Sequence, residues 1–204
     1  MRLQQNKIVN LKLAAACING TFIRPGETLS LWKLIGKPTA KRGFTEGLLI
    51  AQGKPTSGIG GGLCQMANLL HWMFLHSPLI ITERHHHSID LFPDSGRTLP
   101  FGTGATIFYN YVDLQVKNPT KHTLQLHVWV DDEFLKGEIL SDSNTPFRYS
   151  IIEREHAFER DKNNQFWRKN KIYRETRSTQ TGQVLGEELI MNNRARVAYE
   201  PTIG

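Results

Sequence analysis

The stretch GIGGGLCQMANLLHW, residues 58–72, decides the fold class of this 204-residue chain. Four of its first five residues are glycines, and an almost uniformly apolar segment follows from Met66 to Leu75, shortly before Pro78. Apolar residues on every side are typical of a helix that is buried in a core, and a proline ends a helix because it disfavours helical geometry in the preceding residue. We therefore predict a buried central helix that begins near Cys64, directly after a glycine-rich loop.

The segments that follow this helix have the composition of strands. Residues 105–117 and 123–140 are rich in β-branched and aromatic residues and are separated by the turn sequence NPTK. Further strand-like runs occupy the remainder of the chain. The sequence thus predicts an α+β fold in which the central helix packs on an antiparallel β-sheet. We expect a main domain over residues 1–142 and a small β-rich C-terminal extension over residues 143–204, packed on the same domain.

The composition is that of a globular protein with a basic surface. Hydrophobic residues make up 39% of the chain, and 25 Lys and Arg against 19 Asp and Glu give a formal charge of +6. This excess of positive charge favours weak binding to anionic polymers. The basic, aromatic stretch at residues 166–177 is not accompanied by a helix-turn-helix, zinc or RNA-binding motif, so we predict no nucleic-acid partner.

No segment of the sequence has the character of a membrane span. The apolar run at residues 11–18 is much shorter than the roughly 20 residues that a spanning helix needs. No signal segment is visible, which predicts a cytoplasmic protein, whereas a natural chain with a longer N-terminus would be expected in the cell envelope. Two cysteines, Cys17 and Cys64, are too few for a disulfide scaffold, so both are predicted to be free thiols. No feature of the sequence predicts the oligomeric state.

The glycines beside Cys64 point to chemistry at its thiol. Glycine allows backbone amides to come close to a ligand, and the N-terminal end of a helix favours a thiolate. The same amides could hold the oxyanion of a tetrahedral intermediate. We therefore predict that Gly60, Gly61 and Gly62 shape an oxyanion site, and that the pKa of Cys64 lies below that of a free cysteine.

A base for this thiol is available in ERHHHSID, residues 83–90. If this segment is extended, His85 and His87 point to one face. One of these histidines is predicted as the general base, and Asp113 or Asn110 in the following strand as the group that orients its imidazole.

Other interpretations of these residues stay open. The glycine run could cradle a phosphate, and Cys64 with His85 and His87 could bind zinc, although the spacing lacks paired ligands. His71 follows Cys64 by seven residues on the same helical face and is a rival base. A cysteine at a buried helix start also commonly acts as a small hydrophobic residue. We predict neither a metal nor a cofactor.

Longer motifs resemble a known family. The segments NLKLAAACINGTFIRPGETLS, GIGGGLCQMANLLHW, ERHHHSIDLFPDSGRTLPFGTGATIFYNYVDLQVKNPT and LKGEI are similar to the VanW family from about residue 6 to residue 140. The resemblance falls on the following positions: Gly60, Gly61, Gly62, Cys64, Gln65, Glu83, Arg84, His87, Ser88 and Asp113. The resemblance favours His87 over His85 and His86 as the general base. The chain departs from the pattern at Ala67, Asn68 and His71, which weakens the case for His71.

The resemblance implies an accessory role in glycopeptide (vancomycin) resistance or cell-envelope biology. Two hypotheses follow. The first is a cysteine-dependent peptidase, amidase or acyltransferase acting on a cell-wall peptide. The second is a non-catalytic module that binds a peptidoglycan peptide or the glycopeptide at the glycine-rich loop, and its ligand-binding residues are these: Gly60, Gly61, Gly62, Gln65, Arg84, His85 and Ser88.

Overall fold

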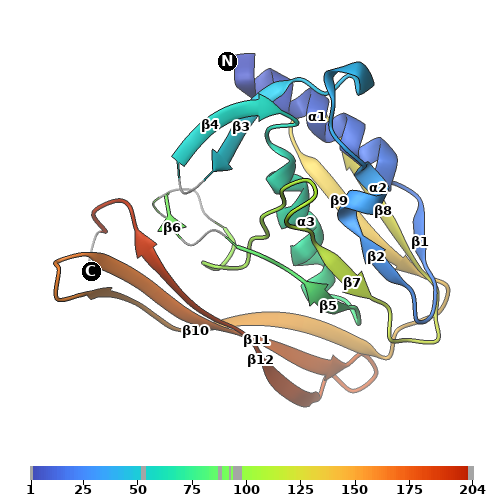
Figure 1. The fold of residues 1–204 in the computed structure, drawn as a ribbon. Coiled ribbons are helices and arrows are strands. Elements are labelled where there is room, and N and C mark those ends of the chain that lie inside the picture. Colours follow the sequence, from blue (N-terminus) through green and yellow to red (C-terminus); the bar gives the residue numbers. More distant parts are fainter. Residues whose placement is uncertain (1, 52–53, 87–88, 92, 94–97, 202–204) are drawn as a thin grey trace. The chain divides into compact units, whose positions relative to one another are not determined.

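The computed structural model describes residues 2–51, 54–86, 89–91, 93 and 98–201 (Figure 1). The chain divides into two compact units. The first unit comprises Met1–His85 and Ala105–Thr145, and the second comprises His86–Gly104 and Pro146–Gly204. Helices and antiparallel sheets are both present, so the predicted α+β class is confirmed.

Among its described residues, the first unit contains three α-helices, one 3-10 helix and three groups of strands. The helical elements are α1 (Arg2–Ile18), α2 (Leu31–Ile35), α3 (Leu63–Leu75) and a 3-10 turn (Ala40–Arg42). The first group of strands, in spatial order, is β1 (Thr21–Ile23), β8 (Leu124–Val130) and β9 (Leu135–Ser141). The second is β2 (Thr28–Ser30), β7 (Gln115–Lys117) and β5 (Ile80–Glu83), and the third is the hairpin of β3 (Glu46–Ala51) and β4 (Lys54–Ile59).

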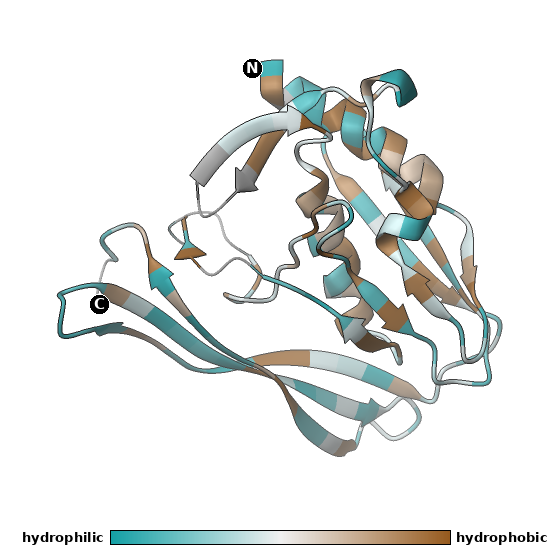
Figure 2. Ribbon diagram, in the orientation of Figure 1, coloured by the Kyte–Doolittle hydropathy of each residue, from teal (hydrophilic) through white to brown (hydrophobic). Residues whose placement is uncertain are grey.

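The core of the first unit forms where α1 and α3 pack against each other and against the sheet of β8 and β9. On α1 the buried residues Leu11, Ala14, Ala15 and Ile18 follow helical spacing, which directs one apolar stripe inward. Helix α3 is largely hydrophobic along its length (Figure 2). Strand β8 alternates buried and partly exposed residues, as expected of a strand with one face on the core.

The predicted strand over residues 105–117 is wrong for most of its length. Only β7 at its end is a strand, and β7 pairs with β2 and β5 instead of joining the sheet of β8 and β9. The preceding residues turn back on themselves, because Phe108 and Val112 form an isolated bridge and Asn110 between them has a φ of 68°. Asparagine tolerates this left-handed conformation better than most residues. The aromatic run therefore forms a loop.

The second unit is built on three long antiparallel strands. They are β10 (Phe147–Arg160), β11 (Phe166–Ser178) and β12 (Val184–Val197), and the short β6 (Ile89–Asp90) pairs in parallel with β12 (Figure 1). Its buried apolar residues are Phe101, Ile172, Met191, Ala195 and Val197. Within the described part of the chain, no helix has the length and apolarity that crossing a bilayer requires.

Candidate functional site

Cys64 lies in the first turn of α3, which is capped by Gly62. The cysteine is only partly exposed and packs against the hydrophobic core, and its S–H donates to the backbone carbonyl of Ile107 over 3.7 Å. Burial raises the pKa of the Cys64 thiol, and this effect outweighs the opposing hydrogen bonds. The expectation of a lowered pKa is therefore wrong, because desolvation exceeds the stabilisation that the backbone supplies.

The glycine run next to Cys64 is explained by close packing within the protein. A Cβ on Gly61 would lie 2.0 Å from the carbonyl carbon of Gly47, so the two backbones are in direct contact. Gly62 has a φ of +94°, a conformation that favours glycine. The amide of Gly60 donates to Thr45, and that of Gly61 donates to Gly58. These two amides therefore already donate hydrogen bonds within the protein. They are not available as donors to an oxyanion in this arrangement.

Asn10 of α1 fixes the same loop from the other side. Its side chain is fully buried, and its amide nitrogen donates to the carbonyl oxygens of Gly61 (2.9 Å) and Thr45 (3.0 Å). Its Oδ1 accepts the backbone N–H of Thr45 over 2.8 Å. Asn10 therefore ties both the glycine-rich loop, at Gly61, and the residue before β3, Thr45, to α1.

The histidine segment is only partly described. His87, the predicted base, and Ser88 lie outside the described residues. His85 lies 3.2 Å from Glu83, measured from Nε2 to Oε1, whereas His86 belongs to the second unit. Among the described residues, no group of three or more His, Cys, Asp or Glu is arranged to hold a metal ion.

The remaining predicted residues have different environments. Gln65 is exposed on the first turn of α3, and His71 is buried in the same helix. Burial lowers the pKa of Arg84 to about 10.

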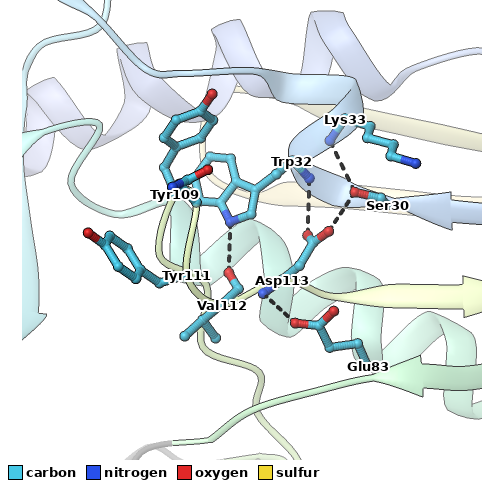
Figure 3. A pocket seen from close by; sticks show the side chains of 9 residues that line it. Ser30, Trp32, Lys33, Glu83, Tyr109, Tyr111, Val112 and Asp113 are labelled. Atoms are coloured by element: carbon cyan, nitrogen blue, oxygen red, sulfur yellow. Dashed lines mark hydrogen bonds between the residues drawn. The ribbon is translucent and has the colours of Figure 1, made fainter.

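Asn110 and Asp113 line an open pocket in the first unit (Figure 3). Its volume is about 480 Å³, and Cys64 is not among its lining residues. The lining residues are Ser30, Trp32, Lys33, Glu83, Tyr109, Asn110, Tyr111, Val112 and Asp113. They come from the start of α2, the end of β5 and the loop before β7. This pocket of the first unit therefore combines polar and aromatic residues.

Asp113 is held on one side of the pocket by the start of α2. Ser30 caps α2, and its hydroxyl donates to Oδ2 of Asp113 over 2.5 Å (Figure 3). The Oδ1 atom accepts the backbone N–H groups of Trp32 (3.1 Å) and Leu114 (2.8 Å). The carboxylate thus satisfies donors at the helix start, where a negative charge is favourable.

Glu83 is held in a similar way. Its Oε1 accepts the backbone N–H of Asp113 over 3.0 Å, and its Oε2 accepts the side-chain amide of Gln115 over 2.6 Å. Two carboxylates therefore share one pocket, and each is fixed by the backbone or side chains of neighbouring elements.

Aromatic rings form another side of the pocket. The indole N–H of Trp32 donates to the carbonyl of Val112 over 2.8 Å, and the ring of Tyr109 meets Trp32 edge-on at 5.5 Å. Tyr111 is 77% exposed. Sequence patterns did not indicate these rings, because FYNYVD has the composition of a strand. The signal that could have identified them is Asn110, a residue typical of tight turns, between two tyrosines.

The family model described as VanW like protein matches residues 6–140. The chain is 37% identical over 199 residues to the vancomycin B-type resistance protein VanW of Enterococcus faecalis, a match that covers 98% of this chain and 72% of that protein. It is 28% identical over 112 residues to the uncharacterized protein YoaR of Bacillus subtilis, covering 53% of this chain and 34% of that one. No solved structure matches the chain.

Proposed function

The chain belongs to the VanW family, and from this membership we propose that it is a binding module of glycopeptide (vancomycin) resistance. The ligand is a peptidoglycan peptide or the glycopeptide itself, and it binds in the pocket between α2, β5 and the loop before β7. This function implies a place in the cell envelope, where both ligands occur.

The observation that carries this proposal is the composition of the pocket. Ligand sites are commonly concave, with apolar and aromatic walls and a few polar groups at fixed positions. The pocket has three aromatic residues, Trp32, Tyr109 and Tyr111, beside two carboxylates that the protein holds in place. Aromatic rings contribute large contact areas with few rotatable bonds, so their ordering costs little entropy.

Binding to the pocket can be tested by isothermal titration calorimetry with a synthetic stem pentapeptide and with vancomycin. Tyr111→Ala removes a ring that is 77% exposed, so it should weaken binding without disturbing the fold. Trp129→Ala is the matched control, because Trp129 is an exposed aromatic residue on β8 that does not line the pocket. Equal affinity in Tyr111→Ala and the unchanged protein would contradict the proposal.

The competing hypothesis is a cysteine-dependent acyl transfer or amide hydrolysis on a cell-wall peptide. Its support is the position of Cys64 in the first turn of α3, where the thiol is not fully buried. In that mechanism Cys64 attacks, His87 acts as base, and Asp113 or Asn110 orients the imidazole. The raised pKa of Cys64 and the hydrogen bonds that already occupy Asp113 both weigh against it.

Cys64→Ser separates the two hypotheses. The binding module retains ligand affinity in this variant, since the thiol does not line the pocket. An enzyme loses turnover by orders of magnitude, because a serine hydroxyl ionises far less readily than a thiol and is a much weaker nucleophile than a thiolate. Mass spectrometry of the stem peptide after incubation would detect any cleaved or transferred product.

A further inference from the structure

The two carboxylates in the pocket carry an inference about the chemistry of the ligand. We propose that the pocket recognises an ammonium group, with Glu83 and Asp113 as acceptors and the rings of Trp32, Tyr109 and Tyr111 as the wall beside it. This inference rests on the proposed function, since it concerns the same pocket and names the group on the ligand that is bound.

Both carboxylates have capacity for one more donor. An ionised carboxylate oxygen can accept two hydrogen bonds. From the described residues, Oδ2 of Asp113 accepts only the Ser30 hydroxyl and Oε2 of Glu83 accepts only the Gln115 amide. The remaining oxygens, Oδ1 and Oε1, bind backbone N–H groups that fix the two side chains. The acceptors are thus ordered before the ligand arrives, which lowers the entropic cost of binding.

Throughout the described part of the chain, no Lys or Arg supplies the positive charge that these carboxylates attract. Neither Glu83 nor Asp113 makes an ion pair with a lysine or arginine there, and the basic side chain next to Glu83 is that of His85. Lys33 lines the pocket, but its side chain extends away from the aromatic rings (Figure 3). A cationic ligand would therefore meet two negative charges without displacing a lysine or arginine from either of them.

The aromatic wall favours the same kind of ligand. The face of an aromatic ring attracts a cation, and Trp and Tyr do so more strongly than other side chains. Three such rings line this pocket together with the carboxylates. An anionic ligand would instead meet like charge, although the chain as a whole carries a formal charge of +6. The pocket thus favours a cationic ligand, whereas the positive net charge of the chain favours anionic ones.

The ammonium group can belong to the lysine of a stem pentapeptide or to an amine of the glycopeptide, and calorimetry with modified ligands tests both sources. Each ligand is titrated with its amine free, monomethylated or acetylated. Monomethylation adds bulk but keeps the positive charge and two N–H donors, one for each carboxylate, whereas acetylation removes the charge. We expect acetylation to weaken binding about tenfold, as for loss of a charged hydrogen bond, and monomethylation to change affinity little. The ligand that shows this pattern identifies the source of the amine.

Asp113→Asn tests the protein side of the interaction. The asparagine Oδ1 can still accept from Trp32 and Leu114, and its amide can donate to the Ser30 hydroxyl, so the start of α2 should keep its hydrogen bonds. The variant should bind the free amine about tenfold more weakly and bind the acetylated ligand unchanged. Asp132→Asn is the matched control, because it removes one negative charge from an exposed residue outside the pocket.

The outcomes separate this inference from the proposed function. Equal affinity for the free and acetylated forms, together with weaker binding in Tyr111→Ala, would overturn the ammonium assignment and leave the binding function in place. Absence of binding by all forms of both ligands would overturn both proposals. Loss of affinity in Asp132→Asn equal to that in Asp113→Asn would show a general effect of charge and would also overturn the assignment.

Discussion

At the scale of single residues, the thiol of Cys64 should react slowly at neutral pH. Burial raises its pKa, so less thiolate is present than in an unfolded chain, where the pKa of cysteine is about 8.5. In a Cys17→Ser background, alkylation by iodoacetamide at pH 7 should be slower for the folded protein than for the same chain in urea. The pH at which the rate reaches half its maximum should also be higher for the folded protein.

The same shift links the stability of the fold to pH. The unfolded thiol ionises at a lower pH than the folded one, so the contribution of Cys64 to stability is present below about 8.5 and declines as the pH rises toward the folded pKa. A folded-state midpoint below that of the urea-treated chain would instead support the cysteine-enzyme hypothesis.

Asn10 should be one of the most sensitive polar residues of the first unit. Its side chain is fully buried and bonds both to Thr45 and to Gly61. Asn10→Ala would leave buried backbone groups without partners, which should lower the free energy of unfolding by about 2–4 kcal/mol in urea titrations.

Asn6→Ala is the matched control for this prediction. Asn6 also lies on α1 and donates to a backbone carbonyl, that of Glu46, but this hydrogen bond is exposed. Its loss should therefore cost about 0.5 kcal/mol or less. Similar costs for the two variants would mean that the loop does not depend on Asn10.

At the scale of elements, the glycine-rich loop and the β3–β4 hairpin should depend on each other. Gly61 and Gly47 are in backbone contact, and a Cβ on Gly61 would overlap the Gly47 carbonyl group. Backbone atoms cannot turn aside as a flexible side chain can, so Gly61→Ala should displace the hairpin and reduce stability by about 3 kcal/mol. Chemical denaturation followed by circular dichroism measures this change.

Gly186→Ala provides the comparison. This glycine lies in β12 with no atom within 4 Å of the position of a new Cβ. Alanine should be neutral or slightly stabilising there, since it restricts the unfolded chain without a clash. The packing interpretation fails if both substitutions have the same effect.

At the scale of the whole molecule, the second unit contains a buried ion pair that its small core depends on. Arg168 and Asp90 are each 4% exposed and lie 3.2 Å apart, and the Tyr199 hydroxyl also donates to Asp90. Asp90→Ala should destabilise this unit by about 3–5 kcal/mol, because it removes an ion-pair partner of a buried guanidinium. Hydrogen exchange should accelerate in β11 and β12.

Glu187→Ala breaks a surface ion pair in the same unit. Its partner Arg154 is 49% exposed, so the expected cost is about 1 kcal/mol or less. Unchanged exchange in β11 and β12 of Asp90→Ala would show that the buried pair is not needed for the stability of these strands.

Local patterns in the sequence determined the class of this protein. Apolar spacing and strand-like alternation repeat within a few residues, so they indicate helices and strands without knowledge of the fold. This is how the α+β class with antiparallel sheets was predicted, and the quoted motifs were enough to indicate the family.

The tertiary structure alone decided what the special residues do. Gly61 is explained by Gly47 and Asn10, which approach it from other segments, and the raised pKa of Cys64 follows from the core that surrounds it. The pocket joins α2, β5 and the loop before β7, three segments that are separated in the chain. Sequence periodicity reports which face of an element is buried, but it does not report which distant element covers that face, and burial and contact of this kind set both pKa and binding geometry.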